Sequence, residues 1–414
     1  MRSADFADSA RRDAKDFTRE RELPLPDLVL ALLNFRKGTV DSELRQFTKA
    51  LHGQDALRSV TGSALCQARM KLRPEALIGL NGQLVGEFQA HFALRLWKGF
   101  RVLAVDGSTG RLPKEEDIQE EFGGPADADR PMARLSRLHD VMNKTVVHAE
   151  MTPYSVGERE LAANHLYHTG ERDLMLYDRG YAAFWVFAMH RDLERNYCAR
   201  LKLNFSPKVT AFLDSGKRSQ LIVLEPNGKA RAQCEEYNLS PEPLTVRLVR
   251  VELENGQVEV LATSLLDPKM YPTRLFGKLY AARWGVEENY KREKLRLEIE
   301  NFSSRTVLTV RQDFHAKIIA LNLAVIMEWV AQAIADRVYE GRKYVAQINF
   351  ANTLSVLKND LIRWIALGMP WDMLLRMLSE IVAAVEPVKP GRSFPRKKGK
   401  SNAREFNSNY NRCA

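Results

Sequence analysis

The fold is decided by residues 173–203, DLMLYDRGYAAFWVFAMHRDLERNYCARLKL. The segment DLMLY is typical of a short buried strand, and it ends at Asp178. Residues 181–193 are rich in aromatic side chains and have the length of a helix, and residues 197–203 return to a strand pattern. Strand, helix and strand in this order predict an α/β sheet covered by helices.

The chain before this stretch continues the same pattern. RVLAV at residues 101–105 is a second strand of the buried type, and it ends at Asp106. Residues 134–141 and 144–151 are expected to form two strands joined by a tight turn, followed by a helix at 158–167. The predicted fold class is therefore α/β.

Residues 205–266 differ in pattern from both neighbours. Turn-forming residues separate four short apolar segments that are expected to be strands: 209–213, 221–224, 244–253 and 258–263. Asn255-Gly256 between the last two segments is a strong hairpin signal. We therefore expect a β-rich insertion in the α/β region.

The N-terminal region is expected to be helical. Two amphipathic segments, 41–52 and 63–72, lie on either side of a glycine break. This arrangement is typical of a helix-turn-helix, and in that case Gln67, Arg69 and Lys71 face DNA. An ordinary packed pair of helices is the alternative.

Charge and composition favour a polyanionic partner. The chain has 414 residues and a net charge of +10, and residues 386–414 hold eight Lys/Arg against two Asp/Glu. A basic tail releases counterions when it binds nucleic acid, although a solubilising tail is the alternative. The four cysteines are widely spaced and the histidines have no zinc-ligand spacing, which argues against a zinc site or a disulfide framework. The polar N-terminus and the interrupted apolar stretch at 318–335 predict a cytoplasmic protein without a membrane span.

The segment YAARWGVEENYKREK, residues 280–294, has the composition of a charged helix. At about 100° per residue, five side chains lie in or beside one stripe about 60° wide: Tyr280, Arg283, Glu287, Lys291 and Lys294. One carboxylate is thus surrounded by cations. A solvated face with an i, i+4 pair between Glu287 and Lys291 is the alternative.

Asp106 and Asp178 each follow a short apolar strand, and sites form at the carboxyl ends of strands in an open α/β sheet. Either one alone is also explained as a turn residue beside a glycine. With Glu287 they form a set of three carboxylates that suits Mg²⁺ or Mn²⁺. Two such ions about 3.5–4 Å apart activate an attacking oxygen and stabilise a leaving one. Arg283, Lys291 and Lys294 would then hold the DNA backbone.

The pattern Tyr280-x2-Arg283-x3-Glu287-x6-Lys294 resembles the YREK signature of bacterial DDE transposases of the insertion-sequence-four type. Three further segments are similar to this family, and the resemblance covers roughly residues 60–330. They are VLAVDGS (102–108) at the first Asp, LMLYDRGY (174–181) at the second, and LATSLLD (261–267) ahead of the Glu helix.

The resemblance implies a ribonuclease-H-like catalytic core whose catalytic and metal-binding residues are Asp106, Asp178 and Glu287. It also implies cleavage at transposon ends, often through a hairpin, and strand transfer into target DNA. The implied partners are the terminal inverted repeats, the target DNA and a second copy of the chain, in the bacterial nucleoid. Tyr280, Arg283 and Lys294 are expected to contact DNA near the cleaved end.

The sequence and the resemblance together predict six parts. They are a helical DNA-end-binding domain (1–95), the first part of the catalytic core (96–204), the β-rich insertion (205–267), the second part of the core with the Glu helix (268–335), a C-terminal helical region (336–385) and a basic flexible tail (386–414).

Hairpin chemistry needs an aromatic ring to receive a flipped base. Trp284 lies beside the YREK stripe and is one candidate, with core packing as the alternative. Relatives can carry a Trp just before the segment that LATSLLD resembles, whereas residues 258–260 here are Val-Glu-Val. The identity of the base-receiving residue therefore stays open.

Two other functions share these features. A nuclease or resolvase on the same core would use the same metal site without strand transfer, but the YREK spacing and the long insertion favour transposition. A catalytically inactive DNA-binding regulator is the other alternative, and the presence of all three acidic residues argues against it.

Overall fold

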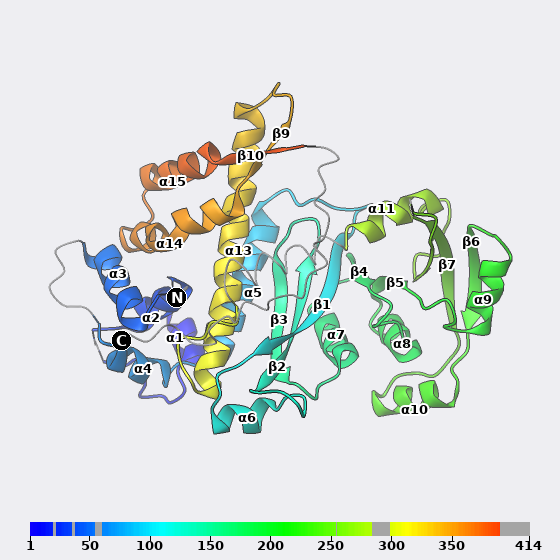
Figure 1. Cartoon of the computed structure of the whole chain (residues 1–414), viewed down its shortest axis with the longest axis horizontal. Coiled ribbons are helices and arrows are strands. Elements are labelled where there is room, and N and C mark those ends of the chain that lie inside the picture. The colour runs from blue at the N-terminus through cyan, green and yellow to red at the C-terminus, as the bar shows by residue number, and fades with distance from the viewer. Residues whose placement is uncertain (20–21, 35–37, 54–59, 254, 284–298, 390–414) are drawn as a thin grey trace. The chain divides into compact units, whose positions relative to one another are not determined.

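The computed structural model describes residues 1–19, 22–34, 38–53, 60–253, 255–283 and 299–389 (Figure 1). The chain divides into two compact units. We call Met1–Ala90, Gly110–Ala133 and Arg292–Ala414 the helical unit, and His91–Thr109 with Arg134–Lys291 the sheet unit.

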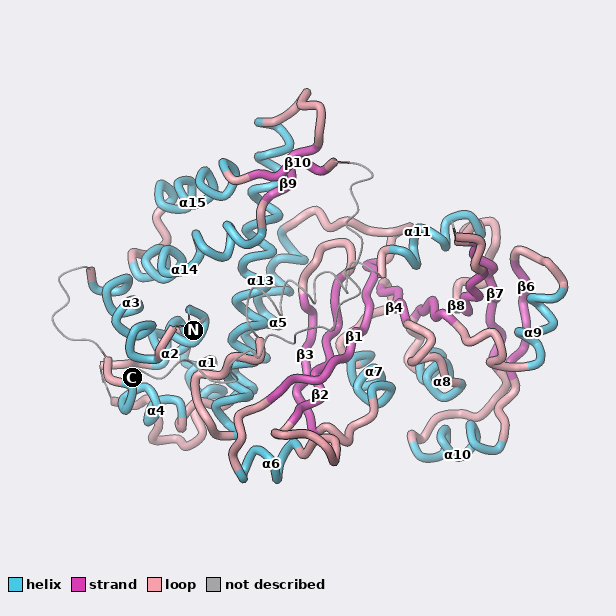
Figure 2. The backbone as a smooth tube through the Cα atoms, in the orientation of Figure 1, coloured by secondary structure: helices cyan, strands magenta, loops and turns pink. Residues whose placement is uncertain are grey.

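The sheet unit is built on eight strands in the order β3-β2-β1-β4-β5-β8-β7-β6, which can be followed in Figure 2. β1, β4 and β5 are parallel neighbours, and β5, β8, β7 and β6 pair antiparallel. The strands are β1 (Arg101–Arg111), β2 (Met132–Asp140), β3 (Val146–Pro153), β4 (Asp173–Tyr177), β5 (Asn196–Arg200), β6 (Ser219–Leu224), β7 (Leu244–Glu252) and β8 (Val258–Thr263).

The two faces of this sheet are covered by different elements. Strand residues alternate between faces, so Leu103 and Met175 lie in one core cluster while Val102 and Leu174 lie in another. The first cluster includes side chains from α7 (Glu158–Leu166), α8 (Phe184–Asp192), α9 (Pro207–Asp214) and α10 (Gly228–Glu236). The second includes α11 (Phe276–Ala281), which follows a short 3-10 turn, η1 (Thr273–Leu275).

The predicted fold is confirmed: an α/β sheet carries a β-rich insertion, and helices occupy the N- and C-terminal parts of the chain. The order β3-β2-β1-β4-β5 forms the ribonuclease-H-like core. One local prediction was wrong, and one helix was not predicted. Residues 209–213 belong to α9, where Ser206 caps the helix and Pro207 opens it, and α10 was missed, although Asn227 caps it.

The helical unit has one core that joins N-terminal helices to α13 and α14. α13 is long and apolar enough to cross a membrane by length and composition, but 56% of its most apolar window is buried, as in a core helix. The unit contains α1 (Ala4–Ala10), α2 (Leu25–Asn34), α3 (Val40–His52), α4 (Gly62–Arg69), α5 (Pro74–His91), α6 (Glu116–Phe122), α13 (Val307–Val338), β9 (Val345–Ile348), α14 (Phe350–Ala366), α15 (Trp371–Ala383) and β10 (Val385–Val388).

Buried histidines make the stability of the sheet unit depend on pH. Burial lowers the pKa of His139, His148 and His190 to about 3, and the pKa of His165 well below its ordinary value. These side chains take up protons mainly on unfolding, so stability present above the unfolded pKa of about 6.5 is lost as the pH falls. Asp140, whose pKa burial raises to about 6, offsets part of this loss.

The free energy of unfolding is therefore expected to fall by about 4–5 kcal/mol between about pH 7.5 and about pH 5.5, measured by urea denaturation. His148→Gln should reduce this change by about 1 kcal/mol, because it removes one buried titrating ring. His52→Gln, on the exposed end of α3, is the matched control and should leave it unchanged. A free energy that does not vary over this range would contradict the prediction.

Candidate active site

Asp106 and Asp178 lie side by side on neighbouring parallel strands. The register of β1 and β4 pairs Leu103 with Met175 and Ala104 with Leu176. Continuing it by two residues brings Asp106 opposite Asp178, on strands about 4.8 Å apart. Both carboxylates also act on the Tyr181 hydroxyl, whose pKa is raised by burial and then by nearby negative charges, these two among them. The structure thus brings the two predicted aspartates together.

The position of Asp106 differs from the expectation in one respect. β1 does not end at residue 105 but continues to Arg111, so Asp106 is part of a strand and not of a turn. β4 does end at Tyr177, and Asp178 follows it directly as predicted. Asp106 therefore lies inside its strand at the level where the neighbouring strand ends.

Arg200 extends this row of charged side chains onto a third parallel strand. β5 pairs Tyr177 with Ala199, which brings Arg200 beside Asp178. Its Nη2 lies 2.6 Å from Asp178 Oδ1, and its Nη1 lies 2.5 Å from Glu259 Oε1 on β8. Sequence reasoning missed Arg200 and Glu259. For Arg200 the available signal was a charged residue at the end of a buried strand, the same feature that singled out the two aspartates. Glu259 lies near the start of β8 and carried no such signal.

The surroundings of Asp178 favour its ionised form. Burial alone would raise the pKa of this carboxyl group, but the Arg179 backbone N–H and the charges of Arg200 and Arg283 lower it overall. The Arg179 N–H donates to Asp178 Oδ1 at 2.7 Å. Asp178 is therefore a carboxylate at neutral pH and can serve as a metal ligand.

Tyr280 and Arg283 lie beside the same carboxylate. Tyr280 is buried, and its hydroxyl donates to the Tyr177 carbonyl oxygen at 3.3 Å, one residue before Asp178. The guanidinium carbons of Arg200 and Arg283 lie 6.0 Å and 5.5 Å from the centre of its ring. Tyr280 and Arg283, two residues of the predicted YREK stripe, thus lie next to Asp178 in this structure.

The other predicted residues of this helix lie outside the described part of the chain: Trp284, Glu287, Lys291 and Lys294. Among the described residues, no group of three His, Cys, Asp or Glu side chains is placed to hold a metal ion. Asp106 and Asp178 nevertheless supply two neighbouring hard oxygen donors of the kind that Mg²⁺ and Mn²⁺ prefer. The donor set therefore fits a divalent cation, with Glu287 as the predicted third ligand.

Comparison with known proteins identifies the family. The profile described as "Transposase DDE domain" matches residues 97–323, which is more than half of the chain. The chain belongs to the transposase DDE domain family. This family assignment, together with the curated relative InsG, confirms the resemblance to insertion-sequence-four transposases.

One curated relative is the transposase InsG for insertion sequence element IS4 of Escherichia coli (strain K12), which is 25% identical over 301 residues. The alignment covers 71% of this chain and 65% of that relative, so the chain spans just under two thirds of the relative's length. A solved structure, a cryo-EM piggyBac transposase synaptic complex with hairpin DNA, aligns with a TM-score of 0.40 and 11% identity. That alignment covers 94% of this chain and 82% of the piggyBac chain.

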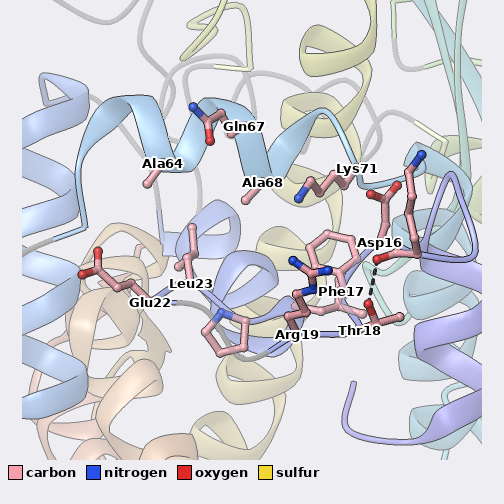
Figure 3. A pocket seen from close by; sticks show the side chains of 13 residues that line it. Asp16, Phe17, Thr18, Arg19, Glu22, Leu23, Ala64, Gln67, Ala68 and Lys71 are labelled. Carbon is pink, nitrogen blue, oxygen red and sulfur yellow. Dashed lines mark hydrogen bonds between the residues drawn. The ribbon is translucent and has the colours of Figure 1, made fainter.

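In this DDE-family chain, the predicted N-terminal DNA contacts separate into two groups. Gln67 and Lys71 line a pocket of about 680 Å³ in the helical unit, under α4 (Figure 3). Lys15 and Arg19 contribute further cations to its lining. Gln67 is exposed and Lys71 is partly exposed, so both side chains are accessible to a ligand.

The prediction that Arg69 faces DNA has to be corrected, because its side chain is only 1% exposed and points into the helical unit. Its Nη2 lies 2.8 Å from Asp313 Oδ1, and its Nε donates to Gln312 Oε1 at 2.9 Å. The guanidinium also donates to the Thr309 carbonyl oxygen at 2.6 Å. The expected exposure to DNA was wrong for Arg69, which instead connects α4 to α13.

Proposed function

We propose that this chain is a DDE transposase that cleaves phosphodiester bonds at the ends of an insertion sequence and joins them to target DNA. The adjacency of Asp106 and Asp178 in a transposase DDE domain carries this proposal. The name of the relative InsG, a transposase for an insertion sequence element, supports it. The six-part division of the chain stays a prediction.

Asp106, Asp178 and Glu287 would hold two Mg²⁺ or Mn²⁺ ions. When bound, these ions activate the attacking oxygen and stabilise the leaving oxygen of an in-line displacement. The neighbours of Asp178 keep its pKa low, so this carboxylate needs no proton loss to bind a cation at neutral pH. No side-chain nucleophile is required.

DNA contacts would come from both units. Near the carboxylates, Lys291 and Lys294 would contact the cleaved end, and Trp284 is a candidate receiver for a flipped base. Tyr280 and Arg283 are only 2% and 6% exposed, so the DNA contact expected of them would require these side chains to be uncovered when DNA binds. In the helical unit, Gln67 and Lys71 would contact the terminal repeats. The basic residues 386–414 would add sequence-independent affinity, because each phosphate contact releases counterions. We expect the chain to act as a homodimer on DNA, in the cytoplasm.

The full-length protein should be incubated with DNA from the ends of its own gene, a target plasmid, and Mg²⁺ or Mn²⁺. The expected result is free 3′-OH ends and joined products, and EDTA should abolish both. Cleavage without joined products at any target concentration would instead identify a nuclease. Specific binding without cleavage would identify a DNA-binding regulator.

A further inference from the structure

The Arg200 side chain is shared between two carboxylates. It is 18% exposed, and its two terminal nitrogens contact Asp178 and Glu259 at 2.6 and 2.5 Å. A further donor, Nε–H, is buried and has no hydrogen-bond acceptor among the residues that the structure describes. A guanidinium can make five donor contacts, so Arg200 keeps unused capacity beside Asp178.

Glu259 owes its position to the register of β8 against β5. Arg200 pairs with Leu261, and Glu259 lies two residues before Leu261 on β8, on the same face. Such diagonal neighbours in an antiparallel pair are within reach of long side chains. Glu259 is only 12% exposed, so its contact with Arg200 is largely shielded from water.

Arg200 and the Arg179 N–H both contact Asp178 Oδ1, so a cation that binds this carboxylate through Oδ1 or through both oxygens has to compete with Arg200. An arginine with a single carboxylate partner would hold that partner firmly, because charge-assisted hydrogen bonds are the strong ones. A second carboxylate, Glu259, gives the guanidinium another negatively charged partner when it leaves Asp178. Glu259 therefore lowers the cost of releasing Asp178.

We propose that Arg200 and Glu259 form a switch with two positions beside Asp178. In the DNA-free protein, Arg200 bridges the two carboxylates. When Asp178 takes a divalent cation, Arg200 keeps Glu259 and offers its released nitrogens to a phosphate oxygen of bound DNA. Glu259 is then a positioning residue. This inference rests on the proposed function, since it takes Asp178 to be a metal ligand.

The switch predicts opposite effects for two variants. Glu259→Gln leaves Arg200 with Asp178 as its charged partner, so Mn²⁺ affinity should fall by about threefold to tenfold. Arg200→Met combined with Glu259→Gln removes the competing cation without leaving a buried charge unpaired, so Mn²⁺ affinity should rise above that of the wild type by about threefold. A pair that only stabilised the fold would weaken binding in both variants.

Mn²⁺ binding should be measured on the full-length, DNA-free protein from the electron paramagnetic resonance signal of free Mn²⁺. Only the Mn²⁺ binding that is lost in Asp178→Asn is assigned to the site. Thermal melts should confirm that each variant is folded. Glu252→Gln is the matched control, because it breaks an exposed pair with Arg250 at 3.3 Å on the neighbouring strand. It should leave Mn²⁺ binding unchanged.

End-DNA cleavage gives an independent measure. In Glu259→Gln, the Mn²⁺ concentration for half-maximal cleavage should rise while kcat at saturating Mn²⁺ stays near the wild-type value. In the double variant, KM for DNA should rise and its salt dependence should become shallower, because one phosphate contact is lost.

Opposite shifts in Mn²⁺ affinity support the switch. Equal shifts, or none in either variant, overturn it. The proposed function is tested separately by Asp178→Asn: loss of Mn²⁺ binding and cleavage there leaves the function standing even if the switch fails. If Asp178→Asn still binds Mn²⁺ and cleaves, the function itself is wrong.

Discussion

The Asp178→Asn variant is expected to lose about a thousandfold or more of its Mg²⁺-dependent cleavage rate on end DNA. An amide lacks the negative charge that a divalent cation requires, and loss of about 4 kcal/mol of transition-state stabilisation corresponds to this factor. DNA binding should persist, because phosphate contacts come from cations elsewhere. Single-turnover cleavage and filter binding measure the two effects.

Asp214→Asn is the matched control, since Asp214 lies on the exposed end of α9 in the same unit. It should cleave at the wild-type rate. A wild-type rate in Asp178→Asn would remove this carboxylate from the proposed metal site. Asp106→Asn should behave like Asp178→Asn, because the two side chains share one register position.

Replacing Arg69 should destabilise the helical unit without directly removing a DNA contact. Arg69→Met leaves Asp313 buried, with its charge uncompensated, at a site where Arg69 and Asp313 are 1% and 5% exposed. Breaking such a buried pair costs about 3–5 kcal/mol of folding free energy. Urea denaturation should show this loss as a lower midpoint with an unchanged slope.

Two comparisons separate this structural role from a DNA-binding one. Arg69→Met combined with Asp313→Leu should recover much of the stability, since neither charge is then left alone in the core. Arg73→Met, at an exposed position four residues further along the chain, should change stability very little. Wild-type stability in Arg69→Met, with weaker binding to end DNA, would restore the original DNA-facing interpretation.

Secondary structure was predicted most accurately from the sequence where the local residue pattern matches the burial seen in the structure. Residues 173–177 and 258–263 are strands with the expected bounds, because apolar runs beside turn residues leave little choice. Residues 209–213 were mistaken for a strand because their β-branched and aromatic content outweighed the helix-starting pair Ser206-Pro207.

Of the proposed metal site, the sequence singled out the candidate carboxylates but not the charged residues around them. Asp106 and Asp178 could be recognised because each follows an apolar run, although Gly107 suggested a turn where β1 in fact continues. Arg69 could not be assigned correctly, since its partner Asp313 lies 244 residues away in the chain. The link between Arg200 and Glu259 likewise depends on strand register, which separate segments do not reveal.

The helical unit is assembled from both ends of the chain, and this has a consequence during synthesis. α2 packs against α3 and α4 and also against α13 and α14, so part of its apolar surface stays uncovered until the ribosome has made residues beyond 360. At about 5–20 residues per second, this delay lasts roughly 15–60 s. A nascent chain that terminates early would expose that apolar surface to chaperones and proteases, so incomplete copies would not accumulate as competitors for DNA.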